Sequence, residues 1–529
     1  MRRIVVAVLL AGSLQAQNPV TSDRLVNALK EPENWLTYWG DYSGIRHREL
    51  NQINTSNVKD LRLEWMFQTG VAGSFQAVPL VVNGVMYFTG GEGTAFAIDA
   101  KTGRQLWRYK YPLPEAKNGF VNGTVNRGLS ILGQLVFMAV PNAHVVALDI
   151  RTGKLVWEAE MADYTKGYGA TVATLVVKDK VIVGITGGEY GIRGFVDAFD
   201  AATGKRAWRF YTIPAKGEPG SETWAGESWR RGGGATWLTG TYDPELNLLY
   251  WPVGNPGPDL YGKERAGDNL YTDSIVALDP DTGKLKWHYQ FTPHDTHDWD
   301  ANETPMLLDL NWQGKPRKLL LQANRNGFFY VLDRVTGEFL SAKPFARQTW
   351  AQGFDKKGRP ILKGETEPSP EGNRQCPGLA GATNWMAPSY NPQTGLFYFA
   401  VRETCDVFFS SAPKYIEGKP FWGSVFRGVT EEREWGMLKA LDPLTGETKW
   451  DFRYDKAPWA GTLSTSGGLV FAADEDGYLM AADAKTGKIL WRIYTGTRLS
   501  TSPMTFMLDG RQYLTMGSGA AVMTFALPK

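Results

Sequence analysis

Residues 99–107 read DAKTGRQLW, and the same phrase, an apolar residue followed by Asp-x-x-Thr-Gly-x-x-x-Trp, occurs seven times in the chain. The copies begin at Asp99, Asp149, Asp200, Asp279, Asp333, Asp442 and Asp483. Six of them carry Trp eight residues after Asp, and the copy at Asp333 carries Ser341 instead. An aspartate at the start of a turn accepts backbone N–H groups, and glycine supplies the positive φ that closes the turn. Each copy therefore predicts one strand–turn–strand unit.

The spacing of the copies indicates how these units are assembled. Successive copies begin 50, 51, 79, 54, 109 and 41 residues apart, which is close to four strands per repeat with insertions in the longer intervals. Further short segments alternate with a period of two and are predicted strands. These are residues 81–88, 135–140, 175–185, 248–253 and 396–401. A short helix is predicted at residues 22–28.

A repeat of this size predicts an all-β fold, a β-propeller built from small four-stranded sheets. A tryptophan at a fixed offset is expected to lie between neighbouring sheets, with its indole N–H bonded to a backbone acceptor. A β-sandwich or several small barrels is the alternative, but neither explains one turn and one tryptophan recurring at repeat spacing.

Composition excludes several classes of protein. The chain has 529 residues, of which 43% are hydrophobic and 21% are charged, so it can bury a large core. Its formal net charge of +2 gives no overall field to attract nucleic acid or an anionic membrane.

The N-terminal residues 1–16, MRRIVVAVLLAGSLQA, have the pattern of a secretory signal peptide, with a cleavage point that the sequence fixes only to within a few positions. Residues 17–529 are then expected to form a single propeller domain that is exported and soluble, because no later stretch approaches the roughly 20 apolar residues of a spanning helix. The two cysteines, Cys376 and Cys405, most simply form one disulfide in an oxidising compartment. Two separate buried thiols are the alternative.

The repeated phrase resembles the tryptophan-docking motif of the eight-bladed pyrroloquinoline quinone (PQQ) dehydrogenases, the quinoprotein methanol and ethanol dehydrogenases. The resemblance covers nearly the whole mature chain and implies an eight-bladed propeller. Segments such as TVNRGL at 124–129, GGGATW at 232–237 and NRNGFFY at 324–330 are similar to the family's PQQ-binding segments. The resemblance implies cofactor contacts from Gln76, Arg127, Thr171, Gly187, Gly188, Trp237, Arg325 and Asn384.

Two positions depart from the family pattern. Val121 and Asn122 stand where methanol dehydrogenase-like enzymes carry two adjacent cysteines that cover one face of the quinone. That ring disulfide cannot form here, so something else must cover this face. Gln76 stands where many relatives carry a glutamate, so it keeps a hydrogen bond but loses the charge.

Cys376 and Cys405 match the family's structural disulfide.

The resemblance also implies a metal site, with Glu189, Asn255 and Asp298 as oxygen ligands of the kind that hard cations prefer. Asp298 would be the catalytic base and Arg325 would stabilise the developing oxyanion. Asp300 separates two classes, because lanthanide-dependent relatives carry a second aspartate two places after the base and calcium-dependent relatives usually do not. One further carboxylate favours a trivalent lanthanide by Coulomb attraction, with Ca²⁺ as the alternative and Asp300 then a loop cap.

These resemblances imply a periplasmic quinoprotein that oxidises primary alcohols to aldehydes by hydride transfer to metal-activated PQQ. Because the sequence has no Cys-x-x-Cys-His motif for haem, a separate soluble cytochrome c is the expected electron acceptor. The alternatives are a quinoprotein for a sugar or polyol and a non-catalytic propeller scaffold. Trp385, Phe421 and Trp422 are candidates for lining the substrate pocket. The oligomeric state, including a homodimer, is left open.

Overall fold

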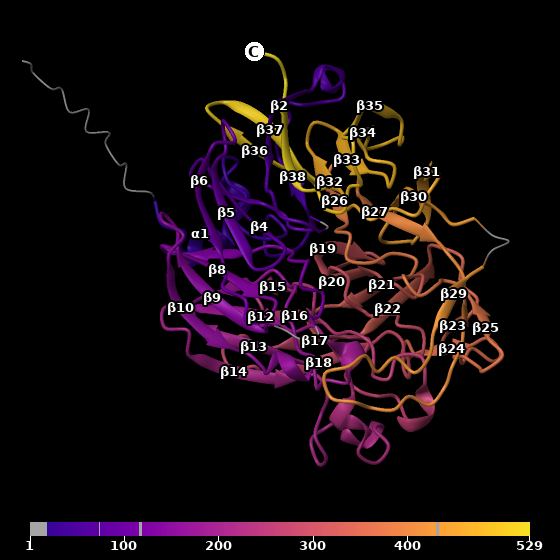
Figure 1. Ribbon diagram of the computed structural model, residues 1–529. Helices are drawn as coiled ribbons and strands as arrows, with labels where there is room; N and C mark the ends of the chain where they lie inside the picture. Colours follow the sequence, from indigo (N-terminus) through magenta and orange to yellow (C-terminus); the bar gives the residue numbers. More distant parts are fainter. Residues whose placement is uncertain (1–17, 74, 116–118, 430–432) are drawn as a thin grey trace, which may run out of the picture.

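The computed structural model describes residues 18–73, 75–115, 119–429 and 433–529, so the predicted signal peptide at 1–16 lies outside the described residues. Within them, eight sheets are arranged in a ring, each with four antiparallel strands, and one of them gains a short fifth strand in parallel pairing (Figure 1). The sequence colours run round this ring from indigo through magenta and orange to yellow, which lies next to indigo again at the top of the view. The predicted eight-bladed β-propeller is confirmed.

The first five blades follow the chain in order, and each is built from its innermost strand outwards. Their strands are β3 (Leu80–Val82), β4 (Val85–Gly90), β5 (Thr94–Asp99) and β6 (Gln105–Lys110); β7 (Ser130–Leu132), β8 (Leu135–Val140), β9 (His144–Asp149) and β10 (Leu155–Glu160); β11 (Leu175–Val177), β12 (Lys180–Gly184), β13 (Phe195–Asp200) and β14 (Arg206–Tyr211); β15 (Thr241–Asp243), β16 (Leu248–Pro252), β17 (Ser274–Leu278) and β18 (Leu285–Gln290); and β19 (Met306–Trp312), β20 (Lys315–Ala323), β21 (Phe328–Asp333) and β22 (Phe339–Pro344).

The last three blades complete the ring. Their strands are β26 (Ser389–Asn391), β27 (Leu396–Glu403), β30 (Trp435–Leu441) and β31 (Thr448–Tyr454); β32 (Leu463–Thr465), β33 (Leu469–Ala473), β34 (Tyr478–Asp483) and β35 (Ile489–Tyr494); and β36 (Met504–Leu508), β37 (Arg511–Ser518), β38 (Ala521–Ala526) and β2 (Arg62–Gln68). In the last blade the outer strand β2 comes from the N-terminal part of the chain and pairs with β38. The ring is therefore closed by hydrogen bonds between the two ends of the chain.

Smaller elements lie outside the blades. The helix α1 (Ser22–Val26) is close to the predicted helix, and β1 (His47–Arg48) pairs in parallel with β32. The long interval after Asp333 holds a hairpin of β23 (Ala351–Phe354) and β24 (Pro360–Leu362) and a sheet of β25 (Asn373–Gln375), β28 (Asp406–Phe408) and β29 (Phe426–Gly428). Single turns of 3₁₀ helix are η1 (Ala28–Lys30), η2 (Val58–Asp60), η3 (Tyr164–Lys166), η4 (Gly188–Tyr190), η5 (Ser221–Thr223), η6 (Ser228–Arg231) and η7 (Gly262–Glu264).

Two predicted strands are each two strands in the structure. Residues 81–88 are divided between β3 and β4 by a turn at Asn83 and Gly84, whose φ angles of 51° and 81° are left-handed. An Asn-Gly pair favours this two-residue hairpin. Residues 175–185 are divided between β11 and β12 at Lys178, with φ of 55°.

The predicted period of two does not appear as a burial pattern in the five segments for which it was predicted, because nearly all of their residues are buried. Five of the six residues of β8 are buried, whereas the outer strand β6 has one buried residue, Trp107, among exposed and half-buried ones. Middle strands lie between two neighbouring blades, so both of their faces are covered.

The predicted docking bond is confirmed for four of the six repeated tryptophans. The Trp107 indole N–H donates to the Ile150 carbonyl in the next blade at 2.9 Å, and a Cβ added to Gly153 would lie 2.7 Å from the Trp107 ring. In six of the seven turns the glycine thus leaves room for a tryptophan ring of the preceding blade, and in the seventh Gly446 faces Lys343. The same indole bond to the next blade is made by Trp65, Trp157, Trp208 and Trp450.

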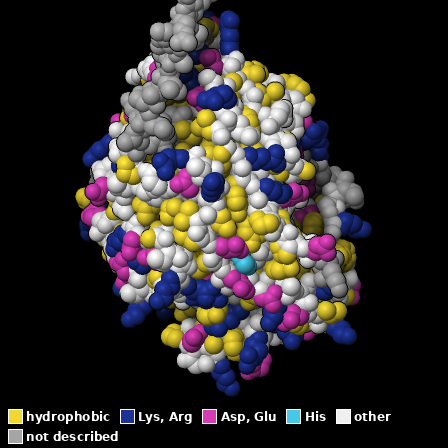
Figure 2. All heavy atoms as spheres, turned by 60° about the vertical axis from the view of Figure 1, so that its left-hand side comes forward, with side chains coloured by type: hydrophobic (Ala, Val, Ile, Leu, Met, Phe, Trp, Pro, Cys, Tyr) yellow, Lys and Arg dark blue, Asp and Glu magenta, His cyan; other side chains and the backbone are white. Residues whose placement is uncertain are grey.

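The surface and the covalent links agree with the composition. Figure 2 shows one face on which Lys and Arg are mixed with Asp and Glu, as expected from the small net charge. The predicted disulfide between Cys376 and Cys405 is present. No helix in the described ranges is long and apolar enough to cross a bilayer.

Candidate active site

The topology brings two kinds of segment to the same end of the ring. Since strands within a blade are antiparallel, the segment that leads into the first strand and the loop between the second and third strands lie at one end. The Asp-x-x-Thr-Gly turns join the third strand to the fourth and lie at the other end. Every predicted cofactor or metal residue falls in a segment of the first two kinds.

These segments surround a cavity of about 300 Å³, the lower end of the usual range for a small-molecule site. Nine of the predicted residues line it: Gln76, Arg127, Thr171, Glu189, Trp237, Asp298, Asp300, Arg325 and Asn384. Asn122, Val125, Thr186 and Trp385 complete the lining. Residues from 76 to 385 in the sequence therefore meet in one place.

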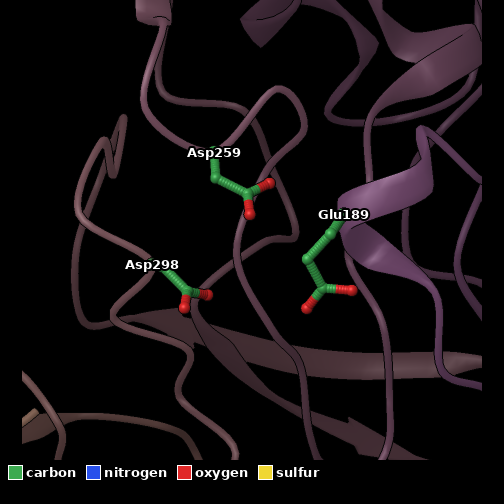
Figure 3. Close-up of side chains that lie close together, drawn as sticks. All are labelled: Glu189, Asp259 and Asp298. Atoms are coloured by element: carbon green, nitrogen blue, oxygen red, sulfur yellow. The ribbon is translucent and has the colours of Figure 1, made fainter. Parts of the chain in front are cut away.

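Three carboxyl groups converge beside this cavity (Figure 3). Oxygens of Glu189, Asp259 and Asp298 all lie within 4.8 Å of one another, a spacing that a single cation could bridge. Glu189 is on the turn η4, where a Cβ added to Gly187 would lie 2.0 Å from the Gly167 carbonyl oxygen. Only glycine fits there, so Gly187 fixes the direction in which Glu189 points.

Asp300 lies in the same cavity but is held differently. Its Oδ2 accepts hydrogen bonds from Arg325 Nη1 at 2.7 Å and from Trp237 Nε1 at 3.0 Å. Its Oδ1 accepts from the Asn255 backbone N–H at 2.8 Å. Both oxygens of Asp300 are thus engaged, and Asn255 is tied to Asp300 through its backbone.

Asp298 and Arg325 form the other half of this network. Arg325 Nη2 donates to Asp298 Oδ2 at 3.2 Å, while Asp298 Oδ1 is enclosed without a hydrogen-bond partner. Arg325 Nη2 also donates to the Leu379 carbonyl. Arg325 therefore connects Asp298 to Asp300 and is itself fixed in place.

The electrostatics of the cluster favour a cation. Burial raises the pKa of Asp298 well above its usual value, Arg325 opposes this rise, and the carboxylates of Asp300 and Glu189 add to it. Burial likewise raises the pKa of Glu189, with Asp300 adding to the effect. Burial alone would lower the pKa of Arg325, but Asp298 and Asp300 outweigh it and raise that pKa. Several buried carboxyl groups that share one guanidinium repel one another when they are ionised. They ionise together readily only if a further positive charge is bound.

The other side of the cavity is aromatic and basic. The Arg127 guanidinium lies 4.6 Å from the centre of the Trp237 ring and 5.5 Å from that of Trp385, and it donates to Thr171 Oγ1 at 2.7 Å. Burial lowers the pKa of Arg127 to about 10, so this side chain stays charged near neutral pH. Buried polar atoms without a partner include Gln76 Oε1, Arg127 Nε and Trp385 Nε1.

Comparison with known proteins identifies the family. The model for the PQQ family, described as glucose/ethanol/alcohol dehydrogenase, β-propeller domain, matches residues 35–343 and 436–514. A quinoprotein alcohol dehydrogenase of Pseudomonas putida is 38% identical over 545 residues, covering 98% of this chain and 91% of that protein. The chain belongs to the PQQ dehydrogenase family.

Lanthanide-containing proteins are among the relatives of this PQQ dehydrogenase. A lanthanide-dependent methanol dehydrogenase of Methylacidiphilum fumariolicum is 37% identical over 540 residues, covering 96% of this chain and 88% of that protein. The solved structure of a europium-containing methanol dehydrogenase matches with a TM-score of 0.90 at 34% identity and covers 96% of this chain and 100% of that one. The family is one of enzymes, so the scaffold alternative loses its support.

The cavity of this PQQ dehydrogenase fits the family's cofactor. A planar, multiply charged quinone needs an aromatic surface and charge-assisted donors, which Trp237 and Arg127 provide. The unpartnered atoms of Gln76, Arg127 and Trp385 are left for a ligand to satisfy. Since the Arg127 guanidinium lies over the Trp237 ring, these two side chains would together hold the quinone, the ring through stacking and the guanidinium through its charge.

The structure separates the predicted residues into those that face the cavity and those that support it. Gly187 precedes the Glu189 turn and Gly188 begins it, and these two residues and Asn255 are not among the lining residues. Trp385, a candidate for the substrate pocket, does line the cavity and stacks on Trp459 with ring centres 4.5 Å apart.

Sequence reasoning missed Asp259. It follows the segment GNPGP at 254–258 directly, and its acidic side chain next to a predicted metal ligand was the available signal.

Proposed function

We propose that this enzyme oxidises primary alcohols to aldehydes, with PQQ as the hydride acceptor and a hard cation beside it. The observation that carries the proposal is the convergence of Glu189 and Asp298 at the edge of a cavity lined by Trp237 and Arg127. The relatives named quinoprotein alcohol dehydrogenase and lanthanide-dependent methanol dehydrogenase support alcohols as the substrate class. When bound, PQQ supplies the two-electron acceptor and the cation polarises it.

Asp298 is the proposed general base. Its Oδ2 is occupied by Arg325, whereas its Oδ1 has no partner and can accept the hydroxyl proton of an alcohol. Burial raises the pKa of Asp298, so its ionised carboxylate is a stronger base than that of an exposed aspartate. The bound cation would keep this carboxylate ionised.

Arg325 is proposed to act electrostatically. Its guanidinium stays charged and is held by Asp300 and the Leu379 carbonyl, so it cannot swing away as charge develops. A fixed positive group in an enclosed site stabilises a developing negative charge without reorganising. Asp300 is a positioning residue in this arrangement.

Glu189, Asn255 and Asp298 are the proposed cation ligands, with Asp300 contributing its charge and becoming a ligand if it releases a hydrogen bond. We propose a lanthanide rather than Ca²⁺, because the negative charge of these carboxylates attracts a trivalent ion more strongly than a divalent one. The lanthanide-dependent and europium-containing relatives support this choice.

We also propose that the enzyme is periplasmic and passes its electrons to a separate cytochrome c. The signal-peptide pattern at 1–16 and the disulfide support export, since disulfides persist in oxidising compartments. Both cysteines are in that disulfide, which leaves none to attach haem.

Reconstitution tests the proposal. The apo-protein is loaded with PQQ plus either La³⁺ or Ca²⁺, and a dye-linked assay follows the oxidation of ethanol, glycerol and glucose. The proposal expects ethanol oxidation that needs PQQ and is faster with La³⁺. Activity with Ca²⁺ alone would overturn the lanthanide assignment, and a preference for glucose or glycerol would overturn the substrate class.

A further inference from the structure

Asp259 is placed like a ligand, although no family segment predicted it. Its side chain is 3% exposed and points towards the carboxylates of Glu189 and Asp298 (Figure 3). Its Oδ1 is buried and has no hydrogen-bond partner. A buried, unpartnered carboxylate oxygen is costly unless something positive binds it.

The backbone around Asp259 is fixed while its carboxylate is left free. Arg265, a buried guanidinium, donates to the carbonyl oxygens of Pro258 at 3.1 Å, Asp259 at 3.3 Å and Asp295. It thereby ties the loop of Asp259 to the loop that leads to Asp298. These bonds go to carbonyl oxygens, so the Arg265 guanidinium anchors the backbone of the loop and makes no hydrogen bond to the Asp259 carboxylate.

The contrast with Asp300 is informative. Both oxygens of Asp300 accept hydrogen bonds from Arg325, Trp237 and Asn255, whereas Asp259 joins Glu189 and Asp298 in the group whose oxygens lie within 4.8 Å. Two cation–oxygen bonds of about 2.4 Å placed opposite each other span about this distance. Of the two additional aspartates, Asp259 is thus the one already arranged for a cation.

We infer that Asp259 is a direct carboxylate ligand of the active-site cation, so that Glu189, Asp259 and Asp298 supply three negative charges to a trivalent ion. The inference rests on the proposed cation site. Three carboxylates balance a lanthanide in charge and leave one net negative charge with Ca²⁺, which favours the trivalent ion. Asp300 then serves mainly to position Arg325 and Trp237.

Binding of Eu³⁺ alone, without PQQ or substrate, tests this inference. Full-length wild-type protein, Asp259→Asn and Glu264→Gln are titrated with Eu³⁺, and luminescence lifetimes in H₂O and D₂O count the waters on the ion. Glu264 is an exposed acid in the same loop and is the matched control. Asp259→Asn should bind Eu³⁺ at least about tenfold more weakly and should gain about one bound water, because water replaces a lost carboxylate. Glu264→Gln should match the wild type.

Thermal unfolding of the metal-free proteins shows whether the Asp259→Asn substitution itself weakens the fold. Oδ1 of Asp259 makes no hydrogen bond that the substitution could remove, and the Asp259 carboxylate repels those of Glu189 and Asp298. Metal-free Asp259→Asn should therefore melt at or above the wild-type temperature. Its gain in melting temperature on adding Eu³⁺ should be smaller than that of the wild type.

The outcomes distinguish two failures. If the wild type binds Eu³⁺ and Asp259→Asn binds it equally well with the same hydration, Asp259 is not a ligand and the proposed function stands. If the wild type does not bind Eu³⁺, the proposed cation site is absent, and both the ligand assignment and the proposed function are overturned.

Discussion

Arg325 donates a 2.7 Å hydrogen bond to Asp300, and the same guanidinium donates to Asp298 two residues earlier in the chain. This pair links the floor of the cavity, through Trp237, to the proposed base. We expect Asp300 to contribute to folding as well as to catalysis, because Arg325, Trp237 and Asn255 donate hydrogen bonds to its buried oxygens.

Replacing Asp300 separates these contributions. Asp300→Ala leaves the Arg325 charge partly unpaired and the Trp237 and Asn255 N–H groups unsatisfied, so the free energy of unfolding of the metal-free protein should fall by about 3 kcal/mol. Asp300→Asn keeps an acceptor and should lose less. Lanthanide-supported turnover should fall in both variants. Chemical denaturation and the dye-linked assay measure these effects, and an Ala variant as stable as the wild type would refute the structural role of Asp300.

Removing the proposed base should stop the reaction without disturbing the fold. Asp298→Asn should lower kcat by about 10²- to 10⁴-fold, the usual contribution of a general base. Asp281→Asn, in a docking turn at the opposite end of the ring, is the control and should keep full activity. Steady-state kinetics after loading with PQQ and La³⁺ provides the measurement. Turnover surviving in Asp298→Asn protein that has bound both groups would assign the base elsewhere.

The docking bonds can be tested with two matched substitutions. Trp107 donates to Ile150, whereas Trp287 packs on Gly337 in the same way but its indole N–H has no partner. Phenylalanine keeps an aromatic ring and removes the N–H. Trp107→Phe should therefore cost about 1 kcal/mol more in unfolding free energy than Trp287→Phe. Equal losses in urea denaturation would mean that the rings alone hold the blades together.

His47 should make the protein sensitive to acid. It lies on β1 between Ser464 and Ser466, and burial followed by repulsion from Arg48 lowers its pKa from 6.5 to about 4. The unfolded chain then binds the proton more readily, so this contribution to stability is complete above pH 6.5 and is lost as the pH falls through 4.

The matched variant for this effect is His47→Gln. The difference in pKa corresponds to about 3 kcal/mol, and His47→Gln should lose less stability than the wild type between pH 6.5 and 4. Unfolding free energies measured across that range are compared for the two proteins. Parallel pH curves would show that His47 does not cause the acid sensitivity.

Local sequence was sufficient to predict the blades, because the docking turn is a short-range structure. Asp, Gly and Trp each act within nine residues, and the same turn repeats. Trp65 escaped prediction because it lies on β2, which is not preceded by such a turn and joins the last blade through pairing across the whole chain. Burial of both faces of β8 was not predictable from the local sequence, because it depends on the neighbouring blades.

The site was predictable where a residue's neighbours in sequence also identify it. Glu189, Asp298 and Arg325 stand in segments that resemble the family's, and the structure brings them to one cavity. Asp259 was missed because its relation to Glu189 and Asp298 arises only when loops from different blades converge. The network around Asp300 was missed for the same reason, since hydrogen bonds to Trp237 and Arg325 join residues that no local spacing connects.

The most direct test of the cation site is a crystal structure of the enzyme loaded with PQQ and Eu³⁺, with data collected at the europium absorption edge. The account predicts one anomalous peak beside the cavity, about 2.3–2.6 Å from oxygens of Glu189, Asp259 and Asp298. A peak bound elsewhere, or a cavity with PQQ and no peak between these carboxylates, would contradict it.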